Sequence, residues 1–211
     1  MTHKLTIFGI SGQTGRELAK SANINGWKVR GFVRATSRVE DIPDNCQIVR
    51  GTFEQPEQVV DAIADSDAVC CVIGPRPPYT DVFCASATKT IIAAMEQTGC
   101  RRIVCQTGAM IGRGPNRSFS MDWMAGYFAG KQPAAAKDRE DQEGVVISSG
   151  LDWTIVKPPR LTNSQAIRRV QAGVMLKVGL LSRISRVNLA AFLLDELETG
   201  RFMCQRVFVK E

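Results

Sequence analysis

The feature that most constrains the fold is a glycine-spaced turn near the start of the chain. An apolar segment, 4–8, runs directly into Gly9-Ile-Ser-Gly12-Gln-Thr-Gly15, and a helix-like stretch follows from residue 16. Gly9 permits a tight exit from a strand, Gly12 lets a pyrophosphate approach the backbone, and Gly15 lets a helix pack closely on the sheet. Free N–H groups at the helix start would face the phosphates, aided by the helix dipole. The turn therefore predicts a dinucleotide site, which also includes the intervening Ser11, Gln13 and Thr14.

The end of the second strand bears on the choice of dinucleotide. An acidic residue about 20 residues after the turn would bind the ribose 2′-hydroxyl of NAD. Here the strand 28–33 ends in Arg34-Ala-Thr-Ser-Arg38, and the first carboxylate is Glu40. Guanidinium groups bind phosphate oxygens in a fork, so Arg34 and Arg38 favour the 2′-phosphate of NADPH. A solvated basic loop is the alternative interpretation.

Composition points to one domain of enzyme size. The 211 residues are 44% hydrophobic, which is enough for one good core. Apolar runs are too short to span a membrane, and the N-terminus begins the first strand rather than a signal peptide. The seven scattered cysteines contain no CxxC pair and suit a reducing compartment. We therefore expect a cytoplasmic protein, a monomer, without a membrane partner.

Two other classes of ligand are disfavoured. The single histidine, His3, precedes the first strand, so no metal site is expected. The net charge of +6 suits an anionic ligand or nucleic acid, but no basic run with interleaved aromatics accompanies it. The expected partner is therefore a small molecule rather than nucleic acid.

Strand-like and helix-like segments alternate along the chain. Further strands are expected at 47–50, 68–73, 102–106 and 153–157, and helices at 57–65, 81–98, 132–149 and 187–197. The Met- and aromatic-rich segment 114–131 is expected to be irregular. This alternation predicts an α/β fold: a Rossmann-type, doubly wound parallel sheet with a small C-terminal substrate-binding extension. We assign 1–211 to a single domain, with 1–159 as the dinucleotide-binding core and 160–211 as the extension.

Five motifs resemble those of a known family. They are the glycine turn with its G-x-x-G-x-x-G spacing, Val33-Arg34 with Ser37-Arg38, Ile73-Gly74, Thr107-Gly-Ala109, and the segment 149–159 (SGLDWTIVKPP). In these the chain is similar to the atypical short-chain dehydrogenases, and among them to the biliverdin-IXβ reductases, or NADPH-dependent flavin reductases, with NmrA-like proteins as cousins. The resemblance covers nearly the whole chain and is more specific in the dinucleotide half.

The resemblance implies two sets of cofactor contacts. The adenosine and phosphate groove should be lined by Thr52, Phe53, Ile73, Gly74, Pro75 and Arg76. The nicotinamide and substrate site should be framed by Thr107, Gly108, Pro158, Pro159, Arg160 and Leu161.

Departures from the family pattern bear on catalysis. Thr52 stands where relatives carry an aspartate, Gly108 replaces a serine, and Arg160 replaces a histidine beside the substrate. No catalytic side chain is therefore assigned, and hydride transfer is expected to rest on positioning of the two rings. Met110, Arg113 and Arg160 are the candidate substrate contacts.

Tyr127-Phe-Ala-Gly-Lys131 matches the Y-x-x-x-K pair of the main short-chain dehydrogenase branch. Counting back from Ser149, however, places the family's tyrosine and lysine at Ala135 and Arg139. Keto-reduction through Tyr127 and Lys131 is therefore the lesser hypothesis. The expected activity is NADPH-dependent reduction of FMN, FAD or riboflavin as substrates, with biliverdin as a less secure acceptor. A non-catalytic, NADP(H)-sensing regulator of the NmrA type is the contrasting alternative.

Overall fold

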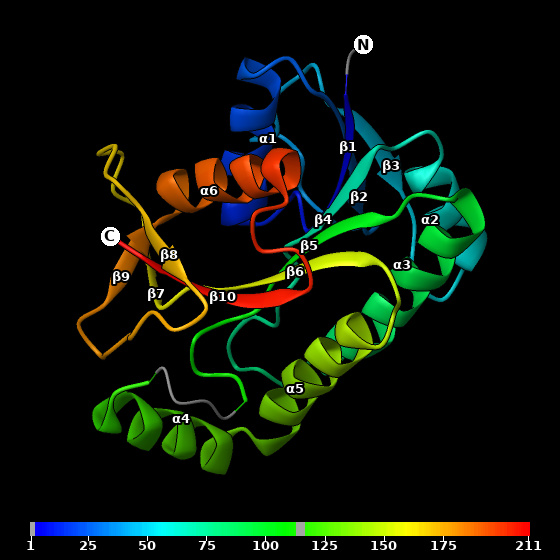
Figure 1. The fold of residues 1–211 in the computed structure, drawn as a ribbon. Coiled ribbons are helices and arrows are strands. Elements are labelled where there is room, and N and C mark those ends of the chain that lie inside the picture. The colour runs from blue at the N-terminus through cyan, green and yellow to red at the C-terminus, as the bar shows by residue number, and fades with distance from the viewer. Residues whose placement is uncertain (1–2, 113–116) are drawn as a thin grey trace.

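A mostly parallel sheet forms the centre of the computed structural model, which describes residues 3–112 and 117–211 (Figure 1). The strand order is β3–β2–β1–β4–β5–β6–β10–β8. The parallel members are β1 (Lys4–Phe8), β2 (Lys28–Val33), β3 (Gln47–Arg50), β4 (Ala68–Cys71), β5 (Arg102–Gln106), β6 (Asp152–Lys157) and β10 (Gln205–Lys210). The edge strand β8 (Gln171–Gly173) is antiparallel to β10. The expected doubly wound parallel sheet is confirmed.

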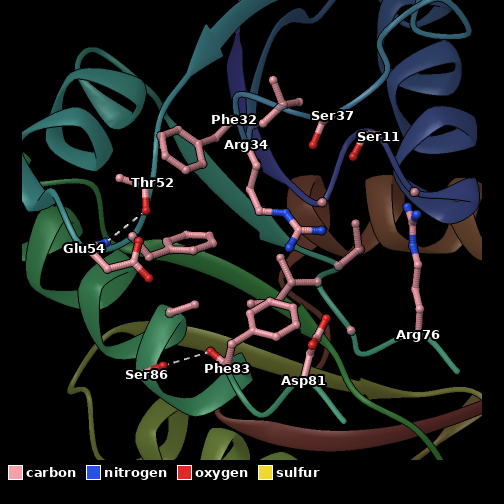
Figure 2. Close-up of a pocket in the computed structure, with 18 residues that line it drawn as sticks. Ser11, Phe32, Arg34, Ser37, Thr52, Glu54, Arg76, Asp81, Phe83 and Ser86 are labelled. Carbon is pink, nitrogen blue, oxygen red and sulfur yellow. Dashed lines mark hydrogen bonds between the residues drawn. The ribbon is translucent and has the colours of Figure 1, made fainter. Parts of the chain in front are cut away.

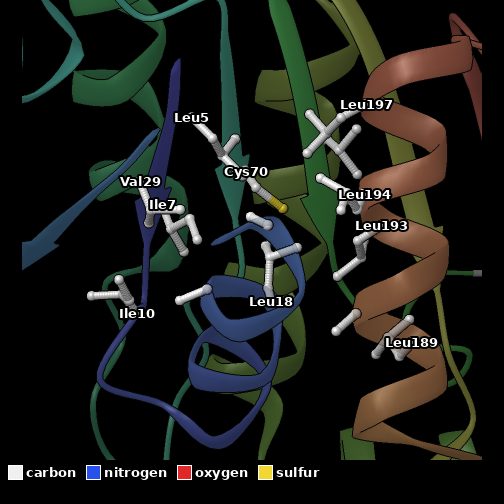
Figure 3. Close-up of a cluster of buried hydrophobic side chains, with 14 of the residues drawn as sticks. Leu5, Ile7, Ile10, Leu18, Val29, Cys70, Leu189, Leu193, Leu194 and Leu197 are labelled. Carbon is white, nitrogen blue, oxygen red and sulfur yellow. The ribbon is translucent and has the colours of Figure 1, made fainter. Parts of the chain in front are cut away.

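Helices cover both faces of this sheet. One face carries α1 (Gln13–Ile24) and α6 (Arg186–Thr199), and the other carries α2 (Pro56–Ile63), α3 (Cys84–Thr98) and α5 (Pro133–Ile147). Figure 3 shows the first core layer, in which side chains of β1 and β4 meet those of α1 and α6. A short parallel ribbon, β7 (Arg160–Thr162) with β9 (Arg183–Ser185), lies beside the sheet.

The central strand β1 is buried on both sides, as its apolar sequence predicts for a parallel sheet. Leu5 and Ile7 belong to the core layer under α1 and α6, whereas Phe8 belongs to the opposite layer. Thr6, the polar member, is fully buried and donates a hydrogen bond of 2.8 Å to the carbonyl oxygen of Ala62. Each of the buried apolar side chains stabilises the fold by about 1.5–3 kcal/mol relative to exposure. The strand that leads into the glycine turn is therefore rigidly held.

The C-terminal segment 160–211 supplies the edge strand β8 and also β10, which lies inside the sheet between β6 and β8. The helix expected at 187–197 is confirmed as α6, which is capped by the Ser185 side chain and ends at Gly200 in the left-handed conformation. β10 pairs with β6 and extends the parallel sheet by one strand.

The segment 114–131 was expected to be irregular, and this was wrong for its larger part. Phe119–Lys131 form α4, a helix that packs on α5 away from the sheet. The hydroxyl of Ser118 caps it by accepting a hydrogen bond of 3.3 Å from the N–H of Met121. Apolar residues occur on all sides of α4, so no one-sided helical pattern marks it in the sequence.

Two features are absent from the part of the chain that the structure describes. Across 3–112 and 117–211, no helix has the length and apolar character needed to cross a bilayer. Nor do three or more His, Cys, Asp or Glu side chains of these ranges come together in a metal-binding arrangement.

Candidate functional site

The glycine turn joins β1 to α1 at the point where the strand order reverses, between β1 and β4. Gly9 has a φ of +93°, and a side chain there would meet the backbone of Val72 at 2.9 Å. A Cβ at Gly15 would lie 2.3 Å from the carbonyl oxygen of Gly9. Both positions therefore need glycine for the fold itself.

Gly12 differs from these two glycines. Its φ of −80° is ordinary, and a Cβ would meet only the carbonyl oxygen of Gly9, at 3.1 Å. A Cβ here would be tight against that oxygen, but it would not clash as severely as at Gly9 or Gly15. Gly12 also lies in the wall of a pocket at the N-cap of α1, where a pyrophosphate on the helix N-terminus would lie.

A pocket of about 240 Å³ opens beside the turn, outside the carboxyl ends of the parallel strands (Figure 2). Open α/β sheets bind ligands in such crevices. Of the predicted cofactor contacts, the pocket wall contains Gly9, Ser11, Gly12, Arg34, Thr52, Phe53, Ile73, Gly74 and Arg76. Sequence reasoning missed much of the remaining lining, which includes Phe32, Glu54, Asp81, Phe83 and Ser86.

The pocket has an aromatic side and a basic side. The rings of Phe32 and Phe53 lie 5.3 Å apart between centroids, and Phe83 lies across the pocket from Phe32. Arg34 points from the end of β2 into the pocket, and Arg76 points toward Ser11. The arrangement suits a flat base beside the aromatic rings and phosphates beside the guanidinium groups.

A second pocket, of about 710 Å³, adjoins the first and shares Ser11, Arg34, Ser37 and Arg76 with it. Its other lining residues are Arg16, Thr36, Arg38, Glu40 and Asp41. Arg16 forms an ion pair with Asp41. The four arginines and two acids leave a formal surplus of two positive charges, which matches a phosphate monoester near neutral pH.

Other predicted cofactor residues lie elsewhere. Gln13 lines a separate pocket between α1 and the segment after β7, while Thr14 and Gly15 are buried within α1. Pro75 is not among the described lining residues of the first pocket, the one beside the glycine turn, which we call the cofactor pocket.

The predicted nicotinamide residues lie at the ends of β5 and β6. Backbone hydrogen bonds join these ends, from Thr107 N–H to the Val156 oxygen at 2.9 Å and from Ala109 N–H to the Pro158 oxygen at 2.8 Å. Gly108, Pro158 and Pro159 therefore follow adjacent strands. Arg160 and Leu161 continue into β7, where the Arg160 side chain is exposed.

Buried charges underlie this edge of the sheet. The Thr107 hydroxyl donates to Glu143 Oε1 at 2.7 Å, and Lys157 forms an ion pair with the same carboxylate. Lys157 also donates to the carbonyl oxygen of Ile111 at 2.9 Å. Burial lowers the pKa of the Lys157 ammonium, and the Glu143 carboxylate partly offsets this effect. Because Thr107 gives its only proton to Glu143, its oxygen faces other partners solely as an acceptor.

Three more polar side chains of α5 organise the same edge. Asp138 accepts hydrogen bonds from the N–H groups of Cys84 and Ala85, at 2.8 and 2.9 Å, and so caps α3. Arg139 donates to the carbonyl oxygens of Ile73 and Gln106, both at 2.9 Å, and so links the chain after β4 to the end of β5. Gln142 donates to the Thr88 hydroxyl at 3.0 Å. Sequence reasoning missed these roles, because charged and amide residues on a helix ordinarily face water.

A third pocket, of about 560 Å³, lies next to the loop after β5, between α4 and α5. Met110, Ile111, Ala125, Phe128 and Ala129 are among its lining residues. Arg117 lies in its wall with Nε 2.7 Å from Asp122 Oδ1, so this guanidinium is already paired. Of the predicted substrate contacts, Met110 lines this pocket, whereas Arg160 is not among its lining residues and is exposed on β7. Arg113 lies outside the described residues.

Tyr127 and Lys131 both lie on α4. The Tyr127 side chain is 56% exposed and stacks on Trp123, with 5.9 Å between ring centroids. Neither residue belongs to the described lining of the third pocket. Ala135 and Arg139, the positions given by counting from Ser149, are both buried on α5.

Comparisons with known proteins agree with this geometry. A sequence profile for a family described as NAD(P)H-binding matches residues 9–199. A chloroplastic protein of Arabidopsis thaliana is 28% identical over 178 residues, which cover 77% of this chain and 60% of that protein. The chain thus spans about 60% of the length of this curated relative.

Solved structures share the fold at low identity. A short-chain dehydrogenase/reductase of Veillonella parvula in complex with NADP has a TM-score of 0.80 at 17% identity, with 100% of this chain and 95% of that chain covered. ChuY, an anaerobilin reductase of Escherichia coli O157:H7, has a TM-score of 0.79 at 17% identity, with coverage of 99% and 97%. The oxidoreductase YlbE of Lactococcus lactis has a TM-score of 0.77 at 16% identity, with coverage of 99% and 90%.

Proposed function

Because the chain belongs to the NAD(P)H-binding family, we propose that it is an NADPH-dependent reductase that transfers hydride to a flavin. FMN, FAD and riboflavin are the proposed acceptors, taken as substrates rather than held as a prosthetic group, and biliverdin is a second acceptor. The anaerobilin reductase among the structural neighbours adds anaerobilin to the acceptors to be assayed. A cytoplasmic monomer is part of the proposal; the seven free cysteines, six of them buried, suit a reducing compartment.

The observation that carries the choice of NADPH is the arginine cluster beside the glycine turn. Arg34 and Arg76 line both the cofactor pocket and the adjoining basic pocket, and Arg38 lines the latter. Of the two acids in the basic pocket, Glu40 and Asp41, Asp41 forms an ion pair with Arg16. The surplus charge therefore favours a nucleotide that carries a 2′-phosphate over one that carries a hydroxyl.

The residues at the sheet edge support cofactor binding in a second way. Gln106 Oε1, at the end of β5, is buried and has no hydrogen-bond partner among the described residues. The Thr107 oxygen offers acceptor capacity nearby, because its proton goes to Glu143. Unpaired buried acceptors are costly, and a carboxamide N–H group of a bound nicotinamide would satisfy one.

The acceptor would lie in the third pocket, whose lining includes Met110, two residues after Gly108. Its volume of about 560 Å³ is within the range of small-molecule sites. Met110 and Phe128 give apolar surface for a flat ring system. Bound NADPH supplies the hydride, and the chain's own contribution is to hold the two rings at reactive distance and to exclude water.

The two alternatives make different demands on the structure. Keto-reduction requires Tyr127 to reach a substrate carbonyl, but Tyr127 is exposed and stacked on Trp123. A regulator of the NmrA type requires only NADP(H) binding. Catalytic oxidation of NADPH would therefore distinguish a reductase from such a regulator.

The test is NADPH oxidation in the presence of FMN, FAD, riboflavin, biliverdin and anaerobilin. Gly12→Val is the matched control, since its branched side chain would enter the proposed pyrophosphate position; a thermal melt without ligand checks that the variant is folded. We expect turnover with a flavin by the wild type and none above background by the variant. Tight NADPH binding without oxidation by any acceptor would contradict the reductase and favour the regulator.

A further inference from the structure

Three aromatic side chains lie along the outer side of α4. Phe119, Trp123 and Tyr127 are four residues apart, a spacing that places them on one side of a helix. They are 89%, 62% and 56% exposed, whereas Met121 and Ala125 are buried. Packing alone would favour burying the aromatic side chains rather than Met121 and Ala125, because burial of a large aromatic ring contributes more stabilising free energy.

A segment that is joined to the start of α4 carries three more exposed apolar side chains. Met175, Leu180 and Leu181 are 69%, 41% and 95% exposed. Their segment is joined to the start of α4, because the Ser118 N–H donates to the Val178 oxygen at 3.0 Å and Arg117 forms a β-bridge with Val178. We call Phe119, Trp123, Tyr127, Met175, Leu180 and Leu181 together the α4 face.

The α4 face is large for a surface in contact with water alone. An aromatic side chain has roughly 200 Å² of surface, so the three aromatics alone expose about 400 Å². The largest apolar patch on a typical soluble monomer covers about 300–600 Å² and is often a functional site.

The charges around the α4 face are mostly basic. Lys131 Nζ lies 5.9 Å from the centre of the Tyr127 ring. Lys177 directly precedes Val178, and Lys210 is held beside it by a hydrogen bond of 3.0 Å to the Lys177 oxygen. The acid on the outer part of α4, Asp122, is paired with Arg117. A second copy of the chain would bring like charges together, whereas an anionic surface would be attracted.

We propose that the α4 face docks on the surface of an anionic lipid bilayer. Trp and Tyr side chains favour the headgroup level of a membrane, where their rings are apolar on one side and hydrated on the other. Basic side chains near the surface are attracted to anionic headgroups. The expectation of no membrane partner rested on the lack of apolar runs long enough to span a bilayer. Binding at the membrane surface does not require a spanning segment. The proposal does not depend on the reductase activity.

The test uses tryptophan fluorescence with phospholipid vesicles. Trp27 and Trp153 are 7% and 9% exposed, so changes in accessibility on docking report mainly on Trp123. Mixed phosphatidylglycerol–phosphatidylcholine vesicles should sediment with the protein, shift its emission to shorter wavelength and protect it from acrylamide quenching. Pure phosphatidylcholine should bind more weakly, and salt should reduce the difference because it screens the lysines.

Variants locate the contact. Replacing Phe119, Trp123 and Tyr127 together by alanine should abolish sedimentation with vesicles, whereas Ile24→Ala, at an 84% exposed position on α1, should not change it. The pair Lys131→Glu and Lys177→Glu should weaken binding to anionic vesicles by about fivefold or more per lysine, the equivalent of about 1 kcal/mol each. Thermal melts and NADPH affinity should match the wild type, which separates loss of docking from loss of fold or cofactor site.

Several results would overturn the proposal. Absence of binding to anionic vesicles would do so, as would binding that the triple variant retains. A dimer in size-exclusion chromatography that the triple variant abolishes would assign the α4 face to a second copy instead.

Discussion

Replacing Arg34 by alanine should weaken NADPH binding while leaving NADH binding nearly unchanged. The guanidinium points into the cofactor pocket and also lines the basic pocket that would hold the 2′-phosphate. A hydrogen bond to a charged group contributes about 1.5–3 kcal/mol, which is roughly a 10- to 150-fold change in affinity. Arg38 and Arg76 stay in place, so the lower part of this range is expected for the single variant.

The assay is isothermal titration of NADPH and NADH into wild type, Arg34→Ala and Arg201→Ala. Arg201 is a suitable control because its side chain is 59% exposed and pairs with Asp195, away from both pockets. The wild type should prefer NADPH, Arg34→Ala should lose about tenfold or more of its affinity for NADPH, and Arg201→Ala should match the wild type. Equal affinities of the wild type for both cofactors would refute the reasoning, and so would an equal loss for both in Arg34→Ala.

Three further outcomes are expected. Gly12→Val should lose NADPH binding by titration and remain folded. Gly15→Ala should lower the melting temperature more than Gly12→Val does, since its Cβ would lie 2.3 Å from a backbone oxygen, against 3.1 Å at Gly12; the reverse pattern would contradict the assignment of the turn. Asp138→Ala removes the cap of α3 and should cost about 1–2 kcal/mol of stability, seen in a melt as a fall of roughly 3–6 °C; an unchanged melt would mean that the cap contributes nothing. Hydride transfer to FMN should be nearly flat between about pH 6 and 8 in single-turnover rates, because the arginines stay charged. A loss of roughly a hundredfold in Tyr127→Phe would restore keto-reduction.

The sequence predicted the parallel core because its signals are local. The turn Gly9–Gly15 and the buried strands carry patterns that neighbouring residues suffice to define, and the strands that were predicted appear within one or two residues of the expected bounds. The strands after residue 159, including β10 of the parallel sheet, were not predicted. The pocket beside the turn follows from the same topology, since a crevice forms where the strand order reverses.

The helix α4 was missed because its pattern is ambiguous. Met121 and Ala125 are buried, but Phe119, Trp123 and Tyr127 are exposed, so apolar residues surround the helix. Periodicity finds a helix only when one side is polar. Ser118 followed by an acid at 122 was the available start signal.

The polar side of α5 could not be predicted for a different reason. Asp138, Arg139, Gln142 and Glu143 have the composition of a solvated helix, yet all four are buried. Apart from the bond between Arg139 and Gln142, the partners cited here are strand ends and residues of α3 that lie at least 14 residues away in the sequence. Only the three-dimensional arrangement brings these groups together, so sequence spacing alone carried no signal.

The most direct test of the central claim is anaerobic single-turnover transfer from NADPH to a flavin. The protein, mixed with NADPH and FMN, should oxidise one NADPH for each flavin reduced, and NADPH deuterated at the transferred position should slow both signals together. NADH should react more slowly under the same conditions, in line with the arginine cluster at Arg34, Arg38 and Arg76. NADPH that binds but is not oxidised, or flavin reduction at the rate of the protein-free mixture, would contradict the account.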